Sequence, residues 1–213
     1  MKKRFIALMA ALLLLPAVCA FAEVAETAET PALQPGDVIT FGRYPEAYNL
    51  ITWRVLAVDD FTATLISEDV IACMRFDYDS SDWASSDLCQ WLNGLFLKNA
   101  FNQNESWRLI ANEEGHRVVI PSREDILNPL YGFSQDSQKK DDARRAKKAE
   151  MLSLNSLWTS KQGYCTYFLR TAEADDNVYQ VRATGNLGVA KVTRENVGIR
   201  PMIRVYVNGL EPN

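Results

Sequence analysis

Three aspartates in the segment FDYDSSD have a spacing that could hold a hard cation. Asp77, Asp79 and Asp82 would offer the carboxylate oxygens that calcium prefers. The segment lacks the glycine and the terminal glutamate of an EF-hand loop. Aspartates are also common in turns, because their side chains accept from nearby backbone N–H groups. A calcium site and a solvated loop are therefore the two interpretations of this segment.

The cysteines are a second possible source of chemistry. Cys73, Cys89 and Cys165 remain once the N-terminal segment is set aside, so at most one disulfide forms within the chain. Cys73 and Cys89 are the preferred pair, because the short loop between them could close. The alternative is three buried thiols that pack as small apolar groups.

Catalytic motifs are missing from the sequence. The chain has one histidine, His116, and no G-x-S-x-G, H-E-x-x-H, C-x-x-C or phosphate-binding loop. A single histidine without partners is far more often a surface or hydrogen-bonded residue than a general base. We therefore expect a protein that is not an enzyme and that needs no cofactor.

Aromatic side chains are the strongest indication of a binding surface. The chain has five tryptophans and eight tyrosines. Trp53, Trp91 and Trp107 lie at positions typical of a core, whereas Tyr78 and Trp83 belong to a predicted loop. Exposed aromatic rings recur at interfaces because they give a large contact area and keep a polar group. Tyr78 and Trp83 are thus candidate ligand-binding residues, for an unknown extracellular glycan or protein.

Two arginines beside predicted strands are further ligand-binding candidates. Arg170 closes a strand at Tyr164–Leu169, and Arg200 precedes Pro201 in the last strand. A covered guanidinium needs a carboxylate, carbonyl groups or a ligand. The alternative is structural: each arginine ties loop carbonyls and an acid such as Asp175 into the domain.

The last strand organises the predicted fold. Residues 197–207 alternate between the two faces, and Pro201 must break the pairing because it cannot donate a hydrogen bond. Earlier strands with turn signals between them are predicted at residues 38–41, 51–58, 63–67, 117–120, 164–169, 178–183 and 187–192. The segments 51–58 and 63–67 are expected to form a hairpin. The gathering of short strands at both ends, with helices between, predicts an α+β fold.

Capping residues predict short helices. Asp87 with Gln90, and Asn102 with Glu105, have the spacing of capping boxes, and a third short helix is expected over residues 123–127. The first helix has a single apolar stripe, made of Leu88, Trp91, Leu92, Leu95 and Phe96. In the second helix Trp107 and Ile110 are expected to pack inward.

The most charged stretch is residues 134–150, which carry four lysines and two arginines among several acids. A basic docking helix is one interpretation. The mixed charges and the lack of an apolar face favour a solvated helix or an insertion.

The N-terminus has the features of a signal peptide over residues 1–22, with a basic start, an apolar run and a small-x-small site at Ala20–Ala22. Cleavage there takes the net charge from −4 to −7, which argues against nucleic acid or an anionic membrane as partner. Residues 23–35 resemble a disordered linker, residues 36–208 a single domain and residues 209–213 a tail. We expect a monomeric protein that is secreted or held at the cell surface, with no membrane span in the mature chain.

Five motifs, in order, resemble a bacterial family. GDVITFGRYP, ITWRVLAV, WASSDLCQWLN, YFLRT and GIRPMIRV are similar to the elements of a widespread domain of unknown function, the family numbered six-two-seven-three. The resemblance covers nearly all of residues 36–207. It departs from the family pattern at Tyr167-Phe168, where two tryptophans are expected, and at Thr171-Ala172, in place of Ser-Pro.

That family is similar to the C-type-lectin-like superfold, which includes formylglycine-generating enzymes. The resemblance implies a single lectin-like α+β domain with two or three short helices, and with residues 38–41 beside residues 203–207. It implies an exported, non-catalytic binding module. An oxidase relative is the alternative, although it would need a second cysteine near Cys165; a purely structural extracytoplasmic domain is the third interpretation.

Overall fold

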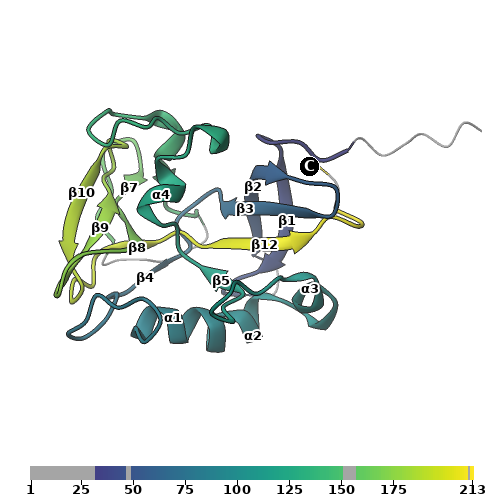
Figure 1. Cartoon of the computed structure of the whole chain (residues 1–213), viewed down its shortest axis with the longest axis horizontal. Helices are drawn as coiled ribbons and strands as arrows, with labels where there is room; N and C mark the ends of the chain where they lie inside the picture. Colours follow the sequence, from purple (N-terminus) through teal and green to yellow (C-terminus); the bar gives the residue numbers. More distant parts are fainter. Residues whose placement is uncertain (1–31, 47–48, 151–156, 211) are drawn as a thin grey trace, which may run out of the picture. The chain divides into compact units, whose positions relative to one another are not determined.

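The computed structural model describes residues 32–46, 49–150, 157–210 and 212–213 (Figure 1). The predicted signal peptide, residues 1–22, and residues 23–31 of the predicted linker lie outside the described residues. The fold is α+β, as the sequence predicts: short helices lie beside small, mainly antiparallel sheets.

The first sheet contains five strands in the order β1-β2-β3-β12-β5. These strands are β1 (Val38–Arg43), β2 (Leu50–Val58), β3 (Thr62–Ser67), β12 (Met202–Tyr206) and β5 (Val118–Val119). The predicted hairpin is confirmed, because β2 pairs antiparallel with β3. All five strands form on runs rich in β-branched or aromatic residues, which fit a pleated, half-buried surface.

The first and last strands share this sheet, with β2 and β3 between them. The direct neighbours of β12 are β3 and β5, so residues 203–207 do not pair with β1 as the resemblance implies. The end of the chain nevertheless meets β1: the Asn213 N–H donates to the Val38 carbonyl oxygen at 2.9 Å.

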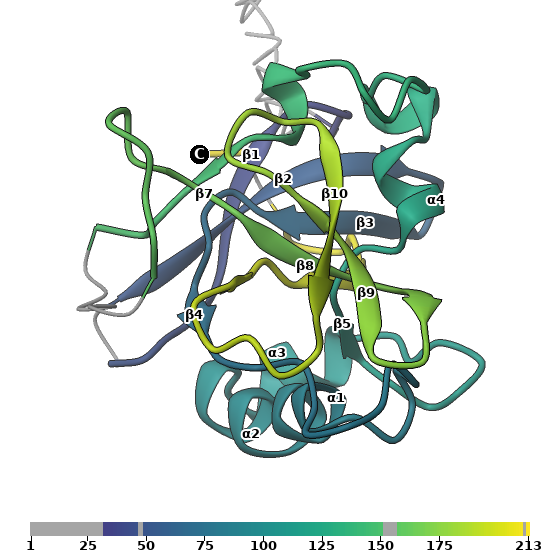
Figure 2. The same ribbon diagram turned by 90° about the vertical axis from the view of Figure 1, so that its left-hand side faces the viewer.

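The second sheet has the order β10-β9-β8-β11-β4. Its strands are β10 (Leu187–Lys191), β9 (Asn177–Val181), β8 (Tyr167–Ala174), β11 (Gly198–Ile199) and β4 (Ala72–Cys73). The strands predicted at residues 178–183 and 187–192 pair antiparallel as β9 and β10, and this hairpin faces the viewer in Figure 2. A separate two-stranded sheet joins β6 (Ala146–Lys147) to β7 (Tyr164–Cys165).

One continuous segment links the two large sheets. β11 belongs to the second sheet and β12 to the first, and the residues between them are Arg200 and Pro201. The predicted break at Pro201 is confirmed. Its carbonyl oxygen instead accepts from the Ser67 N–H at 2.9 Å, at the end of β3.

The helices are short. They are α1 (Asp87–Trp91), a π-helical turn (Leu92–Phe96), α2 (Leu97–Ala100), α3 (Gln103–Arg108) and α4 (Arg123–Ile126), with 3₁₀ turns at Pro129–Tyr131 and Asp142–Arg144. Both sides of the Asn102–Glu105 capping box are present. The cap of α1 is Ser86, not Asp87, since its side chain accepts from the Cys89 N–H.

The π-helical turn corrects the predicted apolar stripe. A π turn holds more residues than an α turn, so positions four apart stay on one side. Leu88, Leu92 and Phe96 are fully buried, while Leu95 is 63% exposed. Trp107 also points outward, at 70% exposure, against the expectation that it packs inward.

The core has two parts. The larger lies between the first sheet and the helices, where Trp53 donates from Nε1 to the Phe41 carbonyl oxygen at 2.6 Å. The smaller is centred on Tyr167, Leu169 and Val181 of the second sheet, and includes Leu56 and Ile66 of the first. Helices α1 and α2 run beneath β5 in Figure 1.

Candidate functional site

Arg200 lies at the crossing between the sheets and is fully buried. Its Nε donates to the Ser67 carbonyl oxygen at 2.8 Å, and its Nη1 to the Arg144 carbonyl oxygen at 3.1 Å. Carbonyl groups therefore hold Nε and Nη1, while the buried Nη2 has no hydrogen-bond partner among the described residues. Arg200 is placed to join parts of the domain rather than to meet a ligand from solvent.

Arg170 ties β8 to the start of α4. Its Nη1 lies 3.0 Å from Asp125 Oδ2 and 2.6 Å from the Ile120 carbonyl oxygen. The acid it pairs with is thus Asp125, and not Asp175. Asp175 lines a shallow hollow with Arg170 and Asp82.

Trp83 is buried, at 7% exposure, which corrects its prediction as a surface residue. Its ring packs near Phe76 and His116, with centroids 6.0 and 6.4 Å apart. Tyr78 is 71% exposed, and the Arg75 guanidinium lies 4.3 Å from its ring centroid. In this loop Tyr78 is therefore exposed to solvent, whereas Trp83 packs into the core.

Two of the three aspartates in the calcium candidate accept hydrogen bonds from nearby N–H groups. Asp77 accepts from the backbone N–H groups of Asp79, Ser80 and Asp87, and Asp82 accepts from Ser85. The carboxylates of Asp77 and Asp82 thus organise the loop before α1. In the part of the chain that the structure describes, no group of three potential ligands, whether His, Cys, Asp or Glu, could hold a metal ion.

The predicted Cys73–Cys89 disulfide does not form. Cys89 is a buried free thiol on α1, whereas Cys73 lies on β4 and its Sγ donates to the Glu195 carbonyl oxygen. Cys165 is also a buried free thiol. Burial raises the pKa of both Cys89 and Cys165 to about 11, so both thiols stay protonated near neutral pH.

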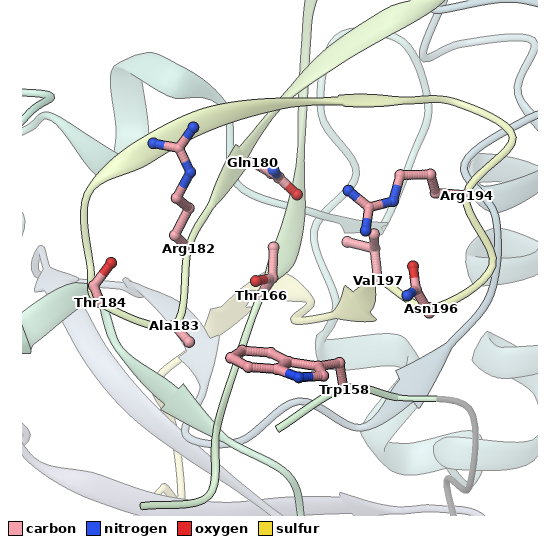
Figure 3. A pocket seen from close by; sticks show the side chains of 9 residues that line it. All are labelled: Trp158, Thr166, Gln180, Arg182, Ala183, Thr184, Arg194, Asn196 and Val197. Carbon is pink, nitrogen blue, oxygen red and sulfur yellow. The ribbon is translucent and has the colours of Figure 1, made fainter. Parts of the chain in front are cut away.

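A pocket of about 490 Å³ opens at the β9–β10 hairpin, and we name it the Trp158 pocket. Its residues come from three separate segments of the chain: Trp158 and Thr166, then Gln180, Arg182, Ala183 and Thr184, then Arg194, Asn196 and Val197. Figure 3 shows the indole of Trp158 on one side, with Gln180, Arg182 and Arg194 opposite. The volume lies in the range of small-ligand sites.

The charged segment 134–150 holds the hairpin turn of this pocket. It contains no α-helix, which corrects the helical interpretation. Arg144 is fully buried and donates to the carbonyl oxygens of Ser134, Ile126 and Gly185. Arg145 donates to the Ala183 carbonyl oxygen at 3.2 Å. Both arginines thus fix the turn that carries three of the pocket residues.

Gly185 permits this close approach. Its φ is +84°, and a Cβ there would lie 2.8 Å from the Asp141 carbonyl carbon and closer still to the carbonyl oxygen. Only glycine fits both the backbone conformation and the contact.

Gln180 presents an unsatisfied acceptor at the pocket. The side chain is 6% exposed and its Nε2 donates to the Val189 carbonyl oxygen at 2.9 Å. A carbonyl can only accept, so the amide nitrogen must face Val189 and Oε1 must point the other way. Oε1 has no partner among the described residues, and Figure 3 shows it directed toward Arg194.

The pocket is positively charged. Arg182 lies across Gly188, where a Cβ would come within 2.6 Å of its guanidinium carbon, and donates to the Leu187 carbonyl oxygen at 2.8 Å. Arg194 is exposed, and its side chain has no hydrogen bond or ion pair within the described part of the chain. Among the described residues, no carboxylate lines the pocket.

Sequence reasoning did not identify these residues. Gln180 was the available signal, because it is a polar residue between the apolar Val178 and Val181 of a predicted strand. Trp158 and Arg194 lie in segments without apolar periodicity, so no local pattern relates them.

Comparison with known proteins places the chain in a family. The family model described as Domain of unknown function (DUF6273) matches residues 62–206, more than half of the chain. The chain belongs to this family. No curated protein and no solved structure matches it. The match confirms the predicted family, and the matched residues contain the last three of the five motifs. The likeness to the lectin superfold stays a prediction.

Among the described residues, no helix has the length and apolar character that spanning a bilayer requires.

Proposed function

We propose that this member of the family is an exported, non-catalytic binding module of lectin-like fold, whose ligand occupies the Trp158 pocket. The observation that carries this proposal is the exposed Trp158 ring, which faces a row of polar side chains across a pocket of about 490 Å³. An aromatic face opposite hydrogen-bonding groups gives both contact area and orientation to a ligand.

Chemistry at the cysteines finds little support. An oxidase would need two reactive thiols, one of them Cys165. That thiol is buried, and its pKa of about 11 keeps it protonated. His116 lies against Trp83, and its Nδ1 lies 3.2 Å from Glu114 Oε2.

Export is proposed on the N-terminal sequence. Lys2, Lys3 and Arg4 precede an apolar run that ends at Ala20–Ala22. Mass spectrometry of the protein released by a bacterial host should give a mature chain that begins at Glu23. Retention inside the cell with residues 1–22 intact would contradict export.

Binding is tested with glycan and peptide arrays. The mature protein should bind ligands on the arrays that the Trp158→Ala variant no longer binds. The matched control is Trp107→Ala, because Trp107 is also exposed, at 70%, but lies outside the pocket. An array on which the protein binds nothing, or binds equally after Trp158→Ala, would favour a purely structural domain.

A further inference from the structure

We propose that the Trp158 pocket takes a saccharide that carries a carboxylate. This inference rests on the proposed function and names the class of ligand. It depends on three features of the pocket: its charge, its single aromatic face and its unsatisfied acceptor.

The charge of the pocket is opposite to that of the protein. The chain has a net charge of −4, yet the described residues that line this pocket include two arginines and no Asp or Glu. Arg182 is already held by the Leu187 carbonyl oxygen. Arg194 keeps all its donors for a ligand, since no described residue pairs with its side chain. Guanidinium groups recognise carboxylates through paired hydrogen bonds, so the ligand is expected to carry an anion.

The buried acceptor, Gln180 Oε1, favours a ligand that carries a hydroxyl as well as an anionic group. Gln180 Oε1 is buried without a donor, and an unsatisfied buried acceptor disfavours the unliganded state. Sulfate or a carboxylate offers no donor to it at neutral pH. The side chains of Arg194 and Gln180 point toward one another in Figure 3. A ligand with both an anionic group and a hydroxyl would therefore pair with Arg194 and donate a hydrogen bond to Gln180 Oε1.

The aromatic face favours a sugar over a peptide. The Trp158 ring is 59% exposed, and its negative face suits the polarised C–H groups of a pyranose. The other apolar residues in the lining are Ala183 and Val197. Thr166, Thr184 and Asn196 offer further hydroxyl and amide groups, which suit the hydroxyl groups of a sugar.

Calorimetric titration tests the inference with matched probes. The probes are short oligomers of galacturonate and of glucuronate, each used as the acid and as its methyl ester, and a peptide that ends in a free carboxylate. The ester keeps the shape of the sugar and removes its charge. The variants are Trp158→Ala, Arg194→Ala and Lys98→Ala; Lys98 is an exposed cation on α2, outside the pocket.

The expected result is that one of the acid oligomers binds at least tenfold more tightly than its ester. Arg194→Ala should lose that tenfold preference, and Lys98→Ala should keep it. Equal binding of acid and ester, both lost in Trp158→Ala, would overturn this inference and leave the proposed function standing. If the protein binds the peptide but neither acid oligomer, this inference is likewise overturned and the proposed function stands. If no probe binds in a manner sensitive to Trp158→Ala, the inference is overturned.

Discussion

Arg200 Nη1 lies 3.3 Å from Tyr167 Oη, and both groups donate to the carbonyl oxygen of Arg144. Tyr167 belongs to the second sheet, and Arg200 leads into the first. Burial raises the pKa of Tyr167, so its hydroxyl stays neutral and donates at physiological pH. The two side chains therefore join both sheets to the segment that supports the Trp158 pocket.

Replacing Arg200 should weaken the whole domain. Arg200→Met leaves the carbonyl oxygens of Ser67 and Arg144 with fewer donors in a dry interior, and we expect unfolding to become easier by about 3 kcal/mol. Arg204→Met is the control: that side chain is about half exposed and pairs with Asp59, so its removal should change stability by less than about 1 kcal/mol. Urea denaturation measures both. Equal losses of stability in the two variants would show that the buried contacts of Arg200 contribute no more than the exposed contacts of Arg204.

Gly185 and Gly163 form a matched pair for the hairpin turn. Their φ angles are +84° and +83°, but among the described residues a Cβ would collide with another segment only at Gly185. Gly163→Ala should lower the free energy of unfolding by about 1 kcal/mol, because alanine disfavours positive φ. Gly185→Ala adds the collision with Asp141 and should lower it by at least about 3 kcal/mol. Thermal unfolding of the two variants, compared at one temperature, gives the difference. Similar losses of unfolding free energy in the two variants would mean that the close contact between Gly185 and Asp141 does not restrict the turn.

The burial of Cys89 and Cys165 predicts how thiol reactivity and folding stability depend on pH. At pH 8, Cys89 and Cys165 should react with a thiol reagent only after unfolding, because a pKa of about 11 leaves very little thiolate. Both folded pKa values lie above those of exposed cysteines, so the stability they contribute is complete below about pH 8.5 and declines as the pH rises toward 11. Rapid labelling of either residue in the native protein would contradict their burial. Mass mapping of the labelled peptides identifies the site.

Local signals predicted much of the fold. The alternation of residues 51–58 and 63–67 predicted the β2–β3 hairpin, and Asn102 with Glu105 predicted the start of α3. Such patterns depend on neighbours in sequence, and each residue type carries its own backbone preference. Leu95 fails the rule because the π-helical turn changes the period, and nothing in its own sequence window signals that change.

The site could not be predicted in the same way. Segment 134–150 is strongly charged and was interpreted as solvated, yet Arg144 is buried because carbonyl groups from Ile126 and Gly185 surround it. Those partners are distant in sequence, as are Trp158, Gln180 and Arg194 in the pocket. Only the folded arrangement brings them together. Trp83 shows the converse, since a loop position did not make its ring accessible.

The most direct test of the account is a calorimetric titration of one array ligand into the wild type, Trp158→Ala and Trp107→Ala. Both tryptophans are exposed, at 59% and 70%, but only Trp158 lines the pocket. We expect Trp158→Ala to weaken binding at least tenfold and Trp107→Ala to bind like the wild type. Unchanged affinity in Trp158→Ala would place the ligand elsewhere and contradict the proposed site.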